Sequence, residues 1–174
     1  MGVAGVSTAD VVLLSSQTAS GDSEIDFTSG LTSTYGEYIF RFYNLNPTAE
    51  VDFTFHCSID GGSNYNVTMT TTHFEARNQE SGSDAGVAYF TGEDQAQGTS
   101  FQSLCLDVGA GGDESVAGEL HLFNPASTTY VKHYYSELTL YHDADYNIHA
   151  FTAGYFNDTN NIDAISFKFV SGDF

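Results

Sequence analysis

Hydrophobic and polar residues alternate along many short segments of the chain. The clearest case is Val51–Ser58, where Val, Phe, Phe and Cys fall on one face and Asp, Thr, His and Ser on the other. A period of two is typical of a β-strand with one buried and one exposed face. The segment ends at Asp60-Gly61-Gly62, where glycine can adopt the positive φ of a tight turn. We therefore predict a β-hairpin across residues 51–65.

The same pattern recurs along the whole chain, with turn residues between the segments. Further strands are expected at residues 11–16, 23–28, 38–43, 65–72, 87–90, 101–108, 116–123, 130–141, 147–156 and 162–170. Residues 71–86 and 92–100 are polar and are expected to form exposed loops. No apolar stripe persists at helical spacing. The expected fold is an all-β, antiparallel, jelly-roll-like β-sandwich of about ten strands. We expect one domain over residues 1–174, with residues 1–10 as an N-terminal arm.

One segment is apolar on both faces. Tyr38, Phe40 and Phe42 share one face, and Ile39 and Tyr43 lie on the other. Such a strand belongs in the middle of a sheet or beneath a subunit interface.

The charge balance excludes some partners. Four Lys and Arg residues stand against 23 Asp and Glu residues, which gives a formal net charge of −19. A phosphate backbone or an anionic membrane surface would be repelled, so we expect no nucleic acid and no membrane insertion. A high net charge most simply serves solubility, and the alternatives are a partner with a positive surface or bound cations.

The only two cysteines, Cys57 and Cys105, lie within apolar alternations. Buried thiols of this kind usually act as small hydrophobic residues. A disulfide between two strands remains the alternative, because the sequence does not give the distance between their Cα atoms.

Candidate metal ligands gather near the end of the chain. His133, His142 and His149 could converge on a metal, but their spacing does not match that of a zinc hydrolase. Asp143, Asp145 and Asn147 copy the first ligand positions of a calcium loop, yet the required glycine and the final glutamate are absent. An acidic hairpin turn is the preferred interpretation, with these three residues as weak metal candidates.

Signals for catalysis are missing from the sequence. It has no Gly-x-Ser-x-Gly elbow, no phosphate-binding glycine loop and no catalytic cysteine context. We therefore expect a non-enzymatic protein, with no catalytic residue and no cofactor.

The chain carries more tyrosine than one core requires. Exposed tyrosines can pack against another subunit or stack on a sugar, and subunit packing is the preferred use. The candidates for an interface or a glycan site are Tyr38, Phe40, Tyr43, Tyr134, Tyr135 and Tyr141.

Five segments, in order along the chain, carry a family resemblance. They are LLSSQTAS at residues 13–20, STYGEY at 33–38, SIDGGSNY at 58–65, GELHLFNPA at 118–126 and AISFKF at 164–169. Together they resemble a group of phage virion proteins, common in marine and cyanobacterial phages. Members occur as small β-sandwich proteins or as terminal domains of tail fibres.

The resemblance implies a function. It implies a virion location and a structural protein, of the head-decoration or tail-fibre type, that binds other virion subunits. It also implies a homo-oligomer, with a trimer as one such state. The alternative is a receptor-binding or carbohydrate-binding module that contacts a host-surface glycan. Proteins of this group continue beyond the equivalent of Ser171-Gly172 into a further strand, so a neighbouring subunit is one expected source of that strand.

Overall fold

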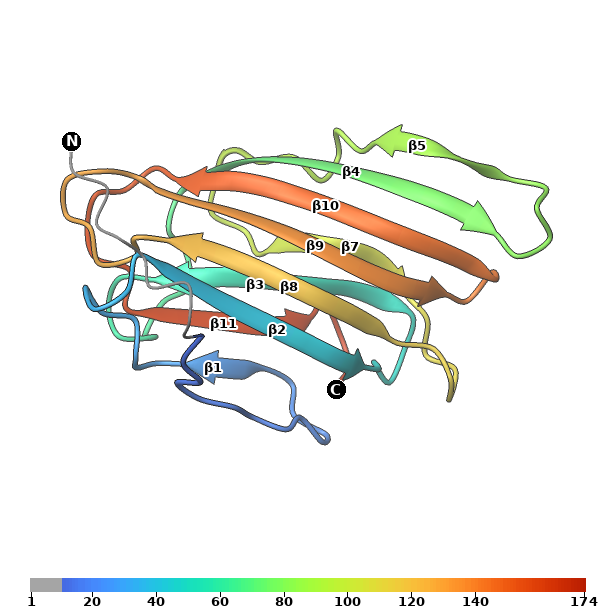
Figure 1. Ribbon diagram of the computed structural model, residues 1–174, viewed down its shortest axis with the longest axis horizontal. Coiled ribbons are helices and arrows are strands. Elements are labelled where there is room, and N and C mark those ends of the chain that lie inside the picture. Colours follow the sequence, from blue (N-terminus) through green and yellow to red (C-terminus); the bar gives the residue numbers. More distant parts are fainter. Residues whose placement is uncertain (1–10) are drawn as a thin grey trace.

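The computed structural model describes residues 11–174, which form two antiparallel β-sheets packed face to face (Figure 1). The strands are β1 (Ile25–Phe27), β2 (Glu37–Leu45), β3 (Val51–Ser58), β4 (Met69–Gln79), β5 (Ala85–Tyr89), β6 (Ala96–Gly98), β7 (Gln102–Val108), β8 (Val116–Phe123), β9 (Lys132–His142), β10 (Tyr146–Phe156) and β11 (Ala164–Phe169). The prediction of an all-β sandwich is confirmed. The predicted arm at residues 1–10 lies outside the described residues.

One sheet has four strands and the other has seven. The smaller sheet has the order β1-β11-β3-β7. The larger has the order β2-β8-β9-β10-β4-β5, with β6 also paired to β4. The long strands β4, β10 and β9 run side by side through its middle (Figure 1). The jelly-roll detail of the predicted topology stays a prediction.

Aromatic side chains fill the space between the sheets. Phe53 and Phe55 of β3 are fully buried, and Phe167 of β11 is 2% exposed. Phe42 of β2 reaches across from the other sheet and meets Phe53 edge-on, with ring centroids 5.1 Å apart. Each such buried ring stabilises the fold by about 1.5–3 kcal/mol relative to leaving it in water.

The predicted hairpin at residues 51–65 is wrong, although its first strand and its turn are confirmed. Gly61 and Gly62 have φ values of 74° and 83°, as a glycine turn requires. After the turn the chain crosses to the other sheet, where β4 begins at Met69, while β3 pairs with β11 and β7. Alternation defines a strand and its faces but does not name the neighbouring strand.

The predicted place of residues 38–43 at a sheet centre is also wrong. In the described part of the chain β2 pairs with β8 alone, so it is an edge strand of the larger sheet. One predicted strand and one predicted loop are wrong as well. Residues 11–16 form no strand, and much of the expected loop at 71–86 is the second half of β4.

Candidate functional site

The two sheets differ in how their outer faces are covered. On the smaller sheet the outward residues Thr54, His56 and Ser58 are 2%, 0% and 0% exposed, so other parts of the chain cover them. On the larger sheet the outward residues include Phe74 at 38% and Tyr89 at 56%. Among residues 11–174, the outer face of the seven-stranded sheet is therefore a large surface with exposed aromatic side chains. We call it the aromatic face.

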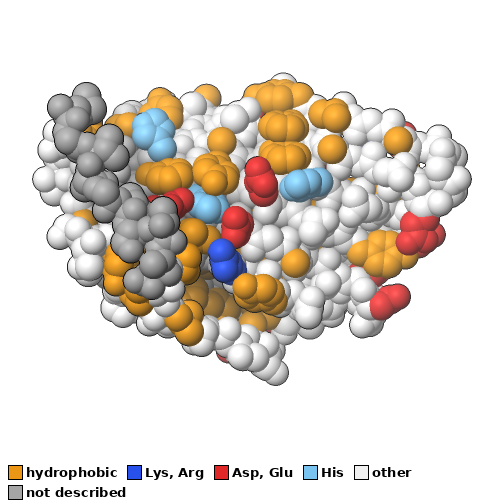
Figure 2. Space-filling view, viewed as in Figure 1, with side chains coloured by type: hydrophobic (Ala, Val, Ile, Leu, Met, Phe, Trp, Pro, Cys, Tyr) orange, Lys and Arg blue, Asp and Glu red, His pale blue; other side chains and the backbone are white. Residues whose placement is uncertain are grey.

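Hydrophobic, aromatic and histidine side chains gather on the aromatic face. Hydrophobic and histidine side chains spread across its middle, and few charged groups lie among them (Figure 2). Its rings are Phe74, Tyr89, Phe123, His121, His133, Tyr135, His149, Phe151 and Tyr155. Its charged residues are Glu37, Arg41, Glu119 and Glu137. All four lie on β2, β8 and β9, and the outward residues of β10, β4 and β5 include no Asp, Glu, Lys or Arg.

Cross-strand pairing builds the first group of rings. Phe74 lies opposite Tyr89 on one side and opposite Phe151 on the other. The rings of Phe74 and Phe151 are stacked, with centroids 4.8 Å apart and planes 10° apart. His149 then stacks on Phe151 at 4.2 Å. The rings therefore stand upright on the sheet and cover one another's faces, and they present mainly their edges to solvent.

A second group surrounds His121 on β8. Its ring stacks on Tyr135 of β9, with centroids 4.5 Å apart. Its Nδ1 lies 2.7 Å from a Glu37 carboxylate oxygen and its Nε2 lies 2.9 Å from Glu119. Arg41 donates from Nε to the other oxygen of Glu119 at 3.2 Å. The four groups form a line of alternating charge along β2 and β8.

Both ring nitrogens of His121 point at carboxylates, so both donate when the ring is protonated. Burial lowers the pKa of His121, but the hydrogen bonds and charges of Glu37 and Glu119 outweigh that effect, and its pKa lies above the ordinary value of 6.5. The same contact lowers the pKa of Glu119, with the hydrogen bond from His121 as the largest cause. The line is thus close to neutral when His121 is charged.

All four basic side chains of the protein are engaged. Arg41 pairs with Glu119, and Arg77 pairs with Asp84 at 3.0 Å. The Lys168 ammonium lies 4.0 Å from the centre of the Phe101 ring. Lys132 is only 1% exposed, and its ammonium donates to the backbone carbonyls of Asp158 and Asn160. The remaining surface carries an excess of acid.

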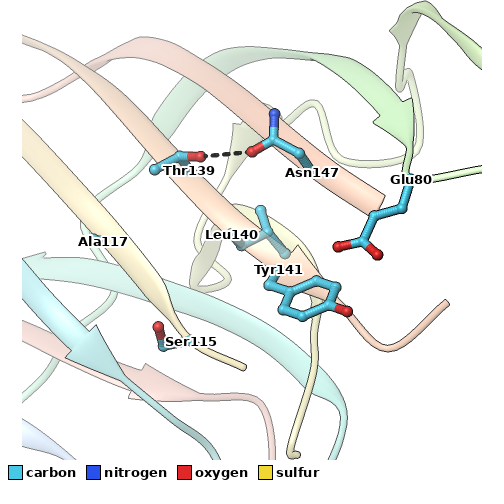
Figure 3. A pocket seen from close by; sticks show the side chains of 7 residues that line it. All are labelled: Glu80, Ser115, Ala117, Thr139, Leu140, Tyr141 and Asn147. Carbon is cyan, nitrogen blue, oxygen red and sulfur yellow. Dashed lines mark hydrogen bonds between the residues drawn. The ribbon is translucent and has the colours of Figure 1, made fainter. Parts of the chain in front are cut away.

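A hollow lies at one end of the aromatic face, beside the β9–β10 hairpin (Figure 3). Its lining residues are Glu80, Ser115, Ala117, Thr139, Leu140, Tyr141 and Asn147. Thr139 donates to the Asn147 side chain at 3.3 Å, and the Tyr141 hydroxyl donates to Asp145 at 3.1 Å. Glu80 and Tyr141 are the ionisable residues among those that line the hollow.

The weak metal candidates Asp143, Asp145 and Asn147 each contact a different neighbouring side chain. Asp143 lies beside His142, with 2.8 Å between its carboxylate and Nδ1. Asp145 accepts from Tyr141, and Asn147 accepts from Thr139 within the strand ladder. Residues 143–145 form the turn of the β9–β10 hairpin, as predicted. His133 and His149 lie in different cross-strand pairs on the aromatic face, away from this turn.

Sequence reasoning missed a different acidic group. Ligand atoms of Glu50, Asp107 and His142 lie within 4.8 Å of one another. A hydrogen bond with Asp143, followed by burial, raises the pKa of Glu50. These residues come from a loop, from β7 and from the end of β9, so only the folded topology brings them together. Glu50 and Asp107 are exposed, and exposed carboxylates often cluster without an ion.

The predicted contact tyrosines separate into two groups. Tyr38 and Tyr134 are 5% and 2% exposed, so they belong to the core and do not offer contact surface. Phe40 packs on Phe167 with ring centroids 5.3 Å apart, which also makes it a core residue. In contrast, Tyr43 and Tyr135 are 71% and 37% exposed. Tyr141 is half-buried at the hollow.

Cys57 and Cys105 are free thiols, both fully buried. Cys105 lies opposite Phe53, four positions before Cys57 along β3. That separation is about 13 Å in a strand, whereas a disulfide requires Cα atoms within about 7 Å. Burial raises the pKa of both thiols. The interpretation as small hydrophobic residues is confirmed, and the disulfide alternative is wrong.

The chain matches no protein-family model, no curated protein and no solved structure. Among residues 11–174, no helix is long and apolar enough to cross a membrane.

Proposed function

We propose that this protein is a non-enzymatic structural component of a phage virion, of the capsid-decoration or fibre type. In this proposal it assembles with other copies of the same chain through the aromatic face. The observation that carries the proposal is the outer surface of β10, β4 and β5, which presents the rings of Phe74, Phe151 and Tyr155 and no Asp, Glu, Lys or Arg residue. The chain as a whole carries a net charge of −19.

Electrostatic repulsion explains why this observation favours self-assembly. Two copies that each carry −19 repel each other wherever their acidic surfaces meet. Contact is least unfavourable where charges are few, and the centre of a protein interface is typically depleted of charge and rich in aromatic residues. The part of the aromatic face on β10, β4 and β5 has both properties. Where charges do occur on this face, the alternating groups Glu37, His121, Glu119 and Arg41 nearly cancel when His121 is protonated.

The size of the face also fits a subunit contact. Six neighbouring strands span about 24 Å, and a strand of eleven residues is about 36 Å long, so the sheet offers roughly 800 Å². A specific interface buries about 800 Å² on each partner. The aromatic face is therefore large enough for one stable contact.

Ring geometry favours a protein partner over a host-surface glycan. A sugar stacks on the open face of an aromatic ring. Phe74 and Phe151 cover each other's faces, and so do His121 and Tyr135. Binding of the isolated protein to a glycan array would favour the receptor-binding alternative.

The virion location is tested by mass spectrometry and antibody labelling of purified particles that encode the chain. The proposal predicts stoichiometric incorporation and regular labelling of the capsid or of the tail. A protein that is expressed but neither built into particles nor co-sedimenting with them would contradict it.

A further inference from the structure

The outer face of the smaller sheet is polar, yet it is buried. Strand alternation places Thr54, His56 and Ser58 of β3 on it, together with Ser166 of β11. Ser166 is 0% exposed, as is His56. A buried polar side chain normally finds a hydrogen-bond partner, because an unsatisfied group costs about 1–3 kcal/mol.

The strand register brings three polar side chains into one row. Asp26 of β1 lies directly opposite Ser166, and Ser166 lies directly opposite His56. Opposite residues of an antiparallel pair project from the same face, with Cβ atoms about 5 Å apart. Ser166 therefore stands in the middle, between a carboxyl group and an imidazole.

Two aromatic rings close the row from outside. The Phe101 ring lies 5.5 Å from the His56 ring and 6.3 Å from the Tyr65 ring, centre to centre. The Lys168 ammonium rests on Phe101. Burial, followed by the nearby charge of Asp26, raises the pKa of the Tyr65 hydroxyl, which places that hydroxyl at the Asp26 end of the row.

Four buried atoms of this group lack a hydrogen-bond partner among the described residues. They are Asp26 Oδ1, Ser166 Oγ, His56 Nε2 and Tyr65 OH. The Tyr65 hydroxyl and the Asp26 carboxyl group are close enough for hydrogen bonding between them to contribute to the raised pKa of Tyr65, although their geometry is not that of an ordinary hydrogen bond. Only two other buried side-chain atoms of the described residues lack a hydrogen-bond partner, Gln95 Oε1 and Ser136 Oγ. Unpaired groups are therefore concentrated in one place rather than scattered.

The row is not a catalytic triad. In a triad the histidine lies between the serine and the carboxylate and hydrogen-bonds to both. Here the serine is central, and no hydrogen bond joins it to either neighbour. Ser166 and His56 are also closed off from solvent by the covering rings.

We propose that this row is a binding site for enclosed water molecules, which bridge Ser166 to His56 on one side and to Asp26 and Tyr65 on the other. Water suits the site because it both donates and accepts, and a buried water typically makes two to four hydrogen bonds. The hydroxyls of Ser166 and Tyr65 can act in either role, while the Asp26 carboxylate accepts.

A water link would give the covering loops a polar attachment to the sheet. Tyr65 and Phe101 belong to connecting segments, and apolar contact alone would leave the groups beneath them unsatisfied. The bridging waters would join the Tyr65 segment to β1, β11 and β3. This inference is independent of the aromatic face and of the proposed function.

A crystal structure at about 1.5 Å resolution tests the proposal directly, with hydrogen-bond distances of about 2.7–3.2 Å as the criterion. We expect ordered water within that distance of Ser166 Oγ and of His56 Nε2. A dry site, or a direct hydrogen bond between Ser166 and His56, would overturn it. A cation in the site would overturn it too, and it would appear as a higher Tm in NaCl than in choline chloride at equal ionic strength.

Two serine variants supply a test in solution. Ser166→Ala removes a water ligand, so we expect Tm to fall by about 2–4 °C, the effect of one hydrogen bond in a chain of this size. The matched control is Ser136→Ala, which removes a buried hydroxyl outside the row, and we expect its Tm to be unchanged or raised. If Ser166→Ala also leaves Tm unchanged or raised, the site is dry and the proposal fails.

Discussion

His121 stacks on Tyr135 across the β8–β9 pair, with ring centroids 4.5 Å apart and planes 10° apart. The stack fixes the plane in which the imidazole meets its two carboxylate partners. Glu37 contacts the imidazole at Nδ1, and Glu119 contacts it at Nε2. A single histidine thus links a ring stack and a line of charges in the aromatic face.

The stability that His121 contributes should be lost as pH rises. Its pKa lies above 6.5 in the folded protein, because the gain from Glu37 and Glu119 outweighs burial. A raised pKa means that the folded state holds the proton more tightly, so the contribution is full below the unfolded pKa and disappears as pH passes the folded pKa. Because both carboxylates are partly exposed, we expect a loss of about 1 kcal/mol. Urea unfolding from about pH 5.5 to pH 8.5 measures it.

His121→Gln is the control for that experiment. Glutamine retains a polar side chain at the position but does not titrate. The free energy of unfolding of the variant should therefore stay constant between pH 6 and 8, to within about 0.3 kcal/mol. An unchanged pH profile in the variant would show that another group causes it.

His56 should act in the opposite direction, under acid. Burial lowers its pKa to about 4, from an ordinary 6.5. The unfolded chain then takes up the proton first, so stability should fall as pH drops from about 6.5 towards 4, by roughly 3 kcal/mol in total. Thermal unfolding across this range, compared with His56→Gln, isolates the effect. If the wild-type protein loses no more stability than His56→Gln as pH falls from about 6.5 to 4, then His56 is not buried as an uncharged ring.

A second buried histidine forms a complete network. His73 of β4 is 0% exposed, with Nδ1 2.8 Å from Thr152 and Nε2 3.3 Å from the buried Glu75. Removing one partner leaves the other buried without compensation, so Glu75→Leu or His73→Leu alone should cost about 3–5 kcal/mol. The double variant should lose clearly less unfolding free energy than the two single variants lose when added together. A double-mutant cycle by urea denaturation measures this, and simple additivity would show that the two groups do not interact.

Gly118 permits the close pairing of β8 with β9. Its φ is 151°, and a Cβ there would contact the Glu137 carbonyl oxygen and lie 2.7 Å from Leu138 Cα. Both obstacles are backbone, so Gly118→Ala should lower stability by about 2–4 kcal/mol. Gly86→Ala is the matched control, because it lies in β5 with nothing within 4 Å of the added carbon. Equal Tm values for the two variants would contradict this interpretation.

The sequence predicted strands well, because alternation records which residues face the core. Strands β8 and β10 were placed within one residue of their observed bounds. Alternation failed in the second half of β4, where the inner residues His73 and Glu75 are polar. Their burial depends on partners from another strand, which no local pattern reveals.

The candidate site was predicted only in part. An excess of exposed aromatic residues was recognised, and Tyr43 and Tyr135 are exposed. The sequence also predicts Tyr134 as a contact residue, but Tyr134 points into the core, opposite to its exposed neighbour Tyr135. The stacking of Phe74 on Phe151 depends on β4 pairing with β10, which lies some seventy residues further along the chain. Partner choice between distant strands was the missing information.

Sedimentation velocity over a range of concentrations tests self-association through the aromatic face. We expect a reversible oligomer that becomes tighter as salt increases from about 0.1 to 1 M, because salt screens repulsion between the acidic copies. Val87 of β5 lies opposite Ala76 and projects from the aromatic face, where it is 73% exposed. Phe74→Glu and Val87→Glu should each weaken association at least tenfold. Tyr130→Glu, at a residue 74% exposed in a loop outside the face, should not. A wild-type protein that stays monomeric at high concentration and high salt would contradict self-association through this face.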